Sequence, residues 1–275
     1  MHGRARIYEH SGVVPIVGLG LVAGVSAGAA YALGWVYGVA IYWMPFVYLA
    51  FLLPLVLAAA LGATVAFAGR AGKVRSAGVC AFAGLAAGLG AQVVQWQVWL
   101  DWFLEPGQLA QLGGALPALS AIAEQGAWSI FGWTPTGGVL WTIWGLEGLV
   151  VVGGTTAVAF GAIADVPFCE RCEVWLTQAT TISPFDFVYD GDQLKATLET
   201  GDFAPLQAME KIRPGATQYA AIDLLECRKC HHFRLVSVKN VVKKQEDGKE
   251  ESEETPIVQN LIVDSQTWDV LAKQV

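Results

Sequence analysis

The chain has 275 residues, of which 54% are apolar and only 15% charged, and its mean hydropathy is +0.46. Soluble domains carry about 25% charged residues, so this composition argues against an ordinary soluble protein and indicates a membrane protein. The net charge of −7 lies mainly in the C-terminal third. We therefore expect no nucleic-acid partner, because nucleic-acid binding needs a basic surface.

Four apolar segments are long enough to cross a bilayer as helices, which takes about 20 mainly apolar residues each. They lie near Val13–Tyr37, Ile41–Gly69, Val74–Leu100 and Gly138–Ala164. The first resembles a secretory signal in its basic flank, but its length and the segments that follow favour a retained helix. We expect a four-helix transmembrane bundle over residues 1–165.

Basic residues predict the orientation of these segments. Those before residue 165 are Arg4, Arg6, Arg70, Lys73 and Arg75. They precede the first segment or fill the connection between the second and third, whereas the connection over residues 101–137 has none. By the positive-inside rule we expect a multi-pass protein of the plasma (inner) membrane with both termini in the cytoplasm. Most tryptophans fall near the predicted outer boundary, where amphipathic rings favour the headgroup region.

Small residues recur at four-residue spacing inside the segments. Gly20, Gly24 and Gly28 lie in the first segment, and Gly84 and Gly88 lie in the third. Such rows let helix backbones approach closely. We expect them to pack helices within the bundle, and the alternative is a self-association face.

Three prolines are expected to disturb helices. Pro45 and Pro54 should bend or interrupt the second segment. Near residues 107–127, leucine and isoleucine repeat at steps of three and four, as in an amphipathic helix lying in the membrane interface. These apolar residues are Leu109, Leu112, Leu116, Leu119 and Ile122. Pro117 weakens a continuous helix there, so we expect a short interfacial or re-entrant element.

Glu147 lies inside the fourth segment, where an ionisable group is costly and is a candidate functional residue. Its candidate neighbours are Gln92, Gln95, Gln97, Tyr31 and Tyr37. Glu147 could bind a proton, a cation or a polar ligand, or it could pin two helices together by a hydrogen bond. No second charged partner lies at a similar depth, which argues against a proton relay or a coupled transporter.

Two Cys-x-x-Cys pairs follow the fourth segment, at Cys169 and Cys172 and at Cys227 and Cys230. Two such pairs can complete a tetrahedral zinc shell of four thiolates. The pattern is similar to zinc-ribbon modules, and the resemblance covers only the cysteine pairs and their flanks. It implies a structural Zn²⁺. The separation between the pairs exceeds the roughly 15–20 residues of compact modules, so a folded insertion must lie between them.

Other chemistry at these cysteines stays open. A reducing cytoplasm argues against disulfides, and a redox role of the Cys-x-x-Cys pairs is the main alternative to metal. His231 and His232 directly follow Cys230 and could replace a ligand. Cys80, inside the third segment, is expected to be a buried packing residue.

The chain after residue 165 is expected to form a small α+β domain over residues 166–275. Two short helices should lie in an insertion at residues 184–213, beside an antiparallel sheet of about three strands. The run Gln245–Glu254 is interpreted as a solvated, mobile hairpin tip because of its acidic residues. A terminal helix is expected near Thr267–Lys273.

Function is narrowed to two classes. The sequence holds no catalytic or nucleotide-binding motif of the common kinds, so an enzyme is the least favoured class. The first class is a membrane sensor, adaptor or assembly protein whose structural-zinc domain binds a protein or a ligand. The alternative is a channel or transporter that uses Glu147 and the glutamines of the third helix and is gated by the zinc domain. The expected partners are the lipid bilayer and either further copies of the chain or another protein.

Overall fold

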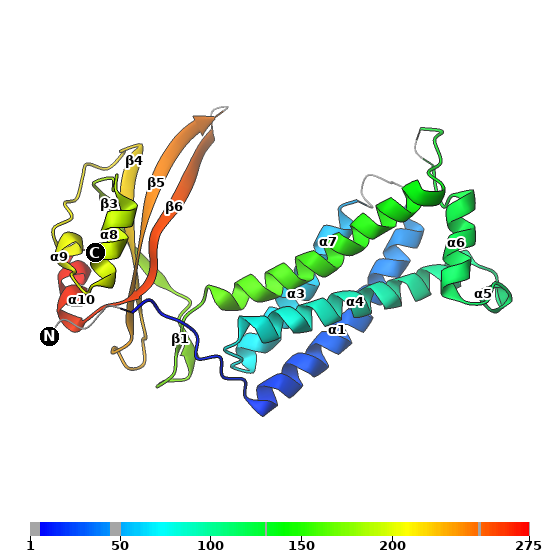
Figure 1. Cartoon of the computed structure of the whole chain (residues 1–275), viewed down its shortest axis with the longest axis horizontal. Coiled ribbons are helices and arrows are strands. Elements are labelled where there is room, and N and C mark those ends of the chain that lie inside the picture. The colour runs from blue at the N-terminus through cyan, green and yellow to red at the C-terminus, as the bar shows by residue number, and fades with distance from the viewer. Residues whose placement is uncertain (1–5, 45–50, 130, 247–248, 275) are drawn as a thin grey trace. The chain divides into compact units, whose positions relative to one another are not determined.

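A computed structural model describes residues 6–44, 51–129, 131–246 and 249–274, with the backbone alone at 245–246 and 249–250 (Figure 1). The chain folds into two compact units. One consists of residues 11–165, and the other joins residues 166–274 to the N-terminal residues 6–10. The N-terminal residues thus fold with the C-terminal unit.

The helical unit contains four long helices, α1 (Ile16–Trp43), α3 (Leu53–Ala71), α4 (Ala77–Phe103) and α7 (Gly137–Ala164). All four are long and apolar enough to cross a membrane. Consecutive helices run in alternating directions (Figure 1). Each of α1 and α7 packs against both α3 and α4. Large apolar side chains cover the outside, as at Phe67 and Phe82, which are 72% and 71% exposed.

The second helix differs from the sequence prediction. Instead of a helix that starts near Ile41, α1 continues to Trp43 and α3 begins at Leu53. Pro54 lies in the first turn of α3, where its missing N–H removes no helical hydrogen bond. The predicted second segment is thus interrupted before Pro54, as one of the two expected outcomes, and Pro54 starts α3 instead of bending it. Pro45 lies outside the described residues.

Glycines bring α1 and α4 close together. A Cβ atom added at Gly34 would lie 2.8 Å from the carbonyl oxygen of Ala91, and one at Gly38 would lie 2.9 Å from that of Gln95. Both distances are shorter than carbon–oxygen contacts allow. Only glycine therefore permits this backbone approach between the two helices.

The glycines singled out from the sequence fall into two groups. Gly84 and Gly88 face α7, because added Cβ atoms would lie 3.0 Å from a side-chain atom of Ala159 and 2.9 Å from the backbone of Val152. Around Gly20, Gly24 and Gly28 there is open space instead. The expectation that this row packs helices within the bundle is wrong, since the buried face of α1 lies on the other side.

Two short helices form the connection between α4 and α7. They are α5 (Gln108–Gln111) and α6 (Ala115–Gln125), and Gly113 and Gly114 separate them with positive φ angles. Pro117 lies in the first turn of α6. Of the predicted apolar face, Leu119 and Ile122 are buried, Leu109 and Leu112 are partly buried, and Leu116 is 72% exposed.

The second unit is built on an antiparallel sheet of four strands, one more than expected, in the order β3-β4-β5-β6. The strands are β3 (Ala179–Phe185), β4 (Gln218–Glu226), β5 (Arg234–Glu246) and β6 (Lys249–Ile262). A separate hairpin is formed by β1 (Phe168–Cys169) and β2 (Val174–Trp175). Three helices lie on one side of the sheet (Figure 1): α8 (Gly191–Glu199), α9 (Ala204–Gln207) and α10 (Ser265–Ala272).

The core of this unit lies between the sheet and those helices. Alternate residues of the central strands, such as Ile222 and Leu224, face Leu198 of α8, Leu206 of α9 and Leu271 of α10 within one apolar cluster. Two helices begin at aspartate N-caps: Asp190 accepts from Gln193 N, and Asp264 accepts from Thr267 N. The sheet and its helical cover therefore share one core.

The acidic run at 245–254 lies in the β5–β6 hairpin, as expected, and its described residues pair as strands. In the described ladder of β5 and β6, Lys244 is opposite Glu251 and Val242 is opposite Glu253. Opposite charges on facing strands stabilise such a pair, and Lys244 Nζ lies 2.6 Å from Glu253 Oε2. Residues 247–248 lie outside the described residues.

Candidate metal centre and cavity of the helical unit

The four cysteines of the two Cys-x-x-Cys pairs meet at one point. Their sulfur atoms all lie within 4.8 Å of one another, and the Sγ atoms of Cys169 and Cys230 are 3.8 Å apart. All four are free of disulfides. A tetrahedral zinc site with Zn–S bonds of about 2.3 Å places its sulfur atoms about 3.8 Å apart. The arrangement of Cys169, Cys172, Cys227 and Cys230 could therefore hold a metal ion.

Two hairpin turns position these sulfur atoms. One turn joins β1 to β2 and contains Cys172, and the other joins β4 to β5 and contains Cys230. In the second turn His231 N donates to the carbonyl oxygen of Cys227 at 2.8 Å. Each turn contains one residue with a positive φ angle, Glu173 at 52° and His231 at 54°. These left-handed residues bend the chain sharply enough to direct both sulfur atoms of a pair to the same side.

The environment of the thiols is uneven. Backbone N–H groups, first that of His232 and then that of Phe233, donate to the Cys230 sulfur and lower its pKa to about 6, although burial opposes this. The pKa values of Cys169 and Cys172 are raised instead, mainly because burial disfavours their thiolates. A bound cation would compensate for the burial of thiolates here, because metal binding and thiol deprotonation are coupled.

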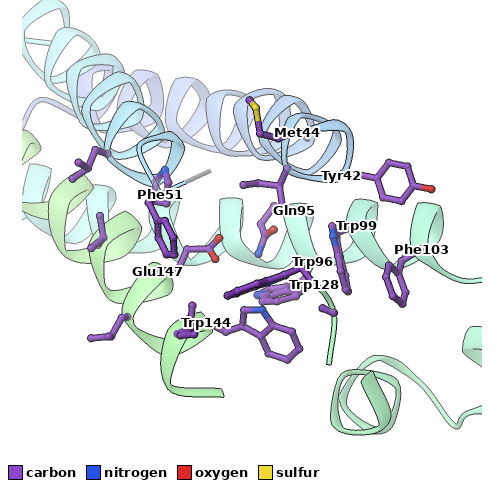
Figure 2. A pocket seen from close by; sticks show the side chains of 17 residues that line it. Tyr42, Met44, Phe51, Gln95, Trp96, Trp99, Phe103, Trp128, Trp144 and Glu147 are labelled. Carbon is purple, nitrogen blue, oxygen red and sulfur yellow. The ribbon is translucent and has the colours of Figure 1, made fainter. Parts of the chain in front are cut away.

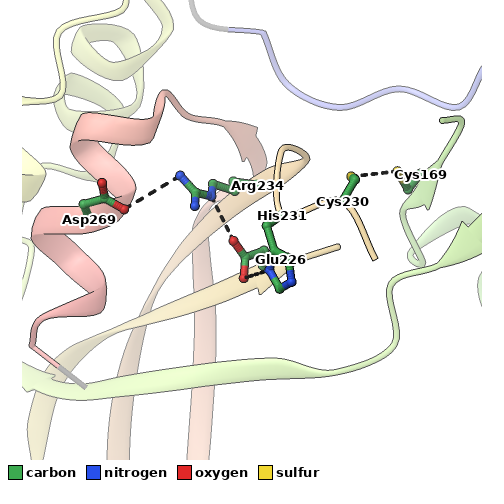
Figure 3. A network of polar contacts seen from close by, with 6 residues as sticks. All are labelled: Cys169, Glu226, Cys230, His231, Arg234 and Asp269. Atoms are coloured by element: carbon green, nitrogen blue, oxygen red, sulfur yellow. Dashed lines mark hydrogen bonds and ion pairs between the residues drawn. The ribbon is translucent and has the colours of Figure 1, made fainter. Parts of the chain in front are cut away.

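The histidines that follow Cys230 are not part of the sulfur cluster. Nδ1 of His231 lies 3.0 Å from Glu226 Oε2, and the His231 side chain is 63% exposed. Arg234 Nε donates to the other oxygen of Glu226 at 3.0 Å, and its Nη1 lies 3.8 Å from Asp269 (Figure 3). Burial raises the pKa of Glu226, but the hydrogen bonds from His231 and Arg234 lower it by more. The net effect is a pKa below the usual value of a glutamate. This network braces the β4–β5 turn against α10.

The N-terminal residues contribute to the surroundings of the cluster, which sequence reasoning missed. Ile7 pairs with Leu261 of β6, and Tyr8 N donates to Asn260 O at 2.8 Å. The Tyr8 hydroxyl accepts a hydrogen bond from Phe168 N at 3.0 Å, directly before Cys169. The apolar cluster around the cysteines includes Tyr8. In the sequence, the apolar Ile7 and the aromatic Tyr8 ahead of the first helix are the signal that could have indicated this contact.

Glu147 of α7 has a hydrogen-bond partner on α1. The Tyr37 hydroxyl donates to Glu147 Oε1 at 2.6 Å. On α4, Gln95 Nε2 donates to Gln92 Oε1 at 3.0 Å, and Gln95 is almost fully buried. Gln97 is exposed and bonds to Asp101 instead. The other tyrosine expected nearby, Tyr31, is also exposed.

Cys80 of α4, which the sequence predicts to be a buried packing residue, is fully buried.

A cavity of about 670 Å³ opens beside Glu147 within the helical unit. It is lined by residues of α1, α3, α4 and α7 and by the segment after α6. The lining includes the aromatic side chains of Phe51, Trp96, Trp128 and Trp144 (Figure 2). From the sequence, these tryptophans were expected at a membrane boundary, and their convergence on a shared cavity was not foreseen.

No protein-family model, no curated protein and no solved structure matches the chain. The function is therefore inferred from the residues and geometry of the chain itself.

Proposed function

We propose that the chain is an integral membrane protein with four membrane-spanning helices and both ends on the cytoplasmic side of the inner membrane. The length of the helices and their exposed apolar surface support this topology. The pairing of Ile7 with Leu261 supports both ends lying on one side, as does an even number of spans. The proposal predicts that a cysteine introduced at Gln111 is labelled from outside intact cells. Labelling only after the cells are opened would contradict it.

The metal in this proposal is Zn²⁺, and its role is structural. Four thiolates close a tetrahedral shell and leave no position for a catalytic water. The cluster joins the β1–β2 hairpin to the β4–β5 turn, which are far apart in the sequence. The ion would thus hold two parts of the domain together.

The proposed activity is that of a membrane adaptor or sensor whose metal-stabilised sheet binds a protein partner. The observation that carries it is the outer strand β6, which lies at the edge of the sheet. Among the described residues, the backbone hydrogen bonds on the free side of β6 involve only Asn260 and Ile262, near the C-terminal end of the strand. Residues 251–256 are exposed. An edge strand with free backbone groups can accept a strand from another protein.

Site-specific photo-crosslinking in native membranes tests the adaptor function. A photoreactive residue replaces Ser252 of β6 in the full chain, and a matched variant carries it at Lys195, an exposed residue of α8. We expect Ser252 to cross-link to one defined protein and Lys195 not to do so. Equal products from both positions, or none from Ser252, would refute partner binding at β6.

Conduction or transport by the helical unit is the second candidate function. The cavity of about 670 Å³ that Glu147 lines favours it, whereas the hydrogen bond from Tyr37 is the one expected of a Glu147 that pins two helices together. The flux of protons or cations into proteoliposomes should then be abolished by Glu147→Gln. Glu124→Gln should leave this flux unaffected, since Glu124 is exposed on α6. Unchanged flux in Glu147→Gln would remove this function.

A further inference from the structure

The cavity beside Glu147 has the size and composition of a small-molecule site. Its volume of about 670 Å³ lies within the roughly 300–1,000 Å³ typical of ligand pockets. Aliphatic side chains such as Leu55 and Val150 line one part of it, and aromatic rings line another. Such a cavity suits a ligand with an apolar body.

The charged residues that line the cavity determine whether a cation or an anion can bind there. Glu147 supplies the one carboxylate among the described residues that line the cavity, and none of them is Lys, Arg or His. Tyr37 donates to one oxygen of that carboxylate, Oε1, from the α1 side. Figure 2 shows the Glu147 carboxylate and the Gln95 amide directed into the space near Phe51 and Trp96. An anion would have no basic partner here, whereas a cation would meet a carboxylate.

The aromatic rings select the kind of cation. Tryptophan faces attract cations, and quaternary ammonium ions are the ligands that such aromatic rings characteristically recognise. The rings are held by one another: the centroids of Trp96 and Trp144 are 5.0 Å apart at an interplanar angle of 75°. Metal cations such as Ca²⁺ require six to eight oxygen ligands. Among the described lining residues, Glu147 and Gln95 are the only carboxylate and amide side chains. The lining therefore suits an organic cation better than a metal ion.

We propose that this cavity binds an organic cation with an apolar body, whose charge lies beside Glu147 and whose body lies among the tryptophan rings. The site would take ions such as tetraphenylphosphonium or quaternary ammonium compounds. A zwitterionic lipid fits this lining less well, because its phosphate would find no Lys, Arg or His among the described residues of the cavity. This inference goes beyond the adaptor function and does not depend on partner binding at β6.

Binding of two probes of the same shape and opposite charge tests the proposal. The full chain is purified in a nonionic detergent, and binding of tetraphenylphosphonium and of tetraphenylborate is measured by equilibrium dialysis, with tryptophan fluorescence as a second readout. We expect saturable binding of tetraphenylphosphonium at one site per chain and no saturable binding of tetraphenylborate. This comparison needs no variant and remains decisive even if substitutions impair folding.

Variants then locate the site. Glu147→Gln should weaken tetraphenylphosphonium binding about tenfold or more, which corresponds to about 1.4 kcal/mol or more, and Trp128→Leu should weaken it to a smaller extent. Glu124→Gln, on the exposed face of α6, should leave the affinity unchanged. The proposal is overturned if tetraphenylborate binds as well as tetraphenylphosphonium, if neither binds saturably, or if a folded Glu147→Gln protein retains the affinity. None of these results bears on cross-linking at Ser252, so the two proposals can fail separately.

Discussion

Cys227 and Cys80 are both buried cysteines, but their neighbours differ. Cys227 belongs to the cluster of four sulfur atoms, whereas Cys80 is an isolated thiol in α4 of the helical unit. We predict that Cys227→Ser loses the bound zinc and unfolds the second unit. Zinc binding contributes about 10–16 kcal/mol in small zinc-finger peptides, which is as large as the whole stability of a typical domain, about 5–15 kcal/mol.

Elemental analysis of the detergent-purified protein checks this prediction. The wild type and Cys80→Ser should contain about one zinc per chain, and Cys227→Ser should contain far less. Zinc retained in Cys227→Ser, or absent from the wild type, would contradict the metal site and return attention to redox chemistry at the cysteine pairs.

Lys239 joins the three strands β4, β5 and β6 by side-chain contacts. Its Nζ lies 3.1 Å from Asp223 Oδ2 and 2.9 Å from Glu254 Oε2. Burial lowers the pKa of Lys239, but the hydrogen bonds to Glu254 and Asp223 outweigh it, so the pKa is raised overall. The stabilisation is therefore complete below the unfolded pKa of about 10.4 and is lost as the pH rises through the higher folded value.

Thermal unfolding at two pH values tests the role of Lys239. At pH 7 we expect Lys239→Met to lower the Tm of the second unit, and above the folded pKa the difference from the wild type should disappear. Lys195→Met, at an exposed position of α8, should match the wild type at both values. A difference for Lys239→Met that persists unchanged at alkaline pH would show that its charge is not the cause.

Among the elements, α1 shows why a spacing of four residues did not identify the buried face. Gly20, Gly24 and Gly28 form one row of small residues, but Ser26, Ala30, Gly34 and other buried residues form a second row at the same spacing. The two rows differ by two residues, which is about 200° around a helix. They therefore lie on opposite faces, and only the contacts with α3 and α4 decide which face is buried.

Substitution by leucine distinguishes the two rows. At Gly34 an added side chain meets the backbone of α4, so Gly34→Leu should destabilise the helical unit by about 1–3 kcal/mol, as overpacking does. Gly24→Leu meets open space and should leave the Tm in detergent nearly unchanged. Equal effects of the two substitutions would contradict the assigned orientation of α1. A change of oligomeric mass in Gly24→Leu alone would support the self-association face.

The parts that could be predicted from the sequence are those set by local patterns. Helix-forming apolar runs depend on residues adjacent in the chain, and each cysteine pair lies within one turn. The cavity could not be predicted in this way, because Phe51, Trp96, Trp128 and Glu147 come from separate elements. The same applies to the extent of β6, whose acidic run indicates only a solvated hairpin tip until the facing strand β5 is known.

At the scale of the whole molecule, Tyr8 links residues 6–10 to the rest of the second unit. Its hydroxyl satisfies the buried N–H of Phe168. Leaving such a group without a partner costs about 1–3 kcal/mol. We therefore expect Tyr8→Phe to lower the Tm of the second unit, measured by scanning calorimetry, and Tyr189→Phe, at a residue 89% exposed, to have no effect. If both variants unfold like the wild type, the N-terminal tie contributes nothing to stability.

Residues 6–10 also impose an order on biogenesis. They leave the ribosome before the four long helices, yet their binding site on β6 is synthesised after all of them. In the proposed topology, the tie cannot form in a chain that has skipped one span, since its two ends would lie on opposite sides of the bilayer. Completion of the domain would then act as a checkpoint on insertion, because in a misinserted chain Asn260 and Ile262 would lack the backbone partners that Tyr8 and Arg6 supply.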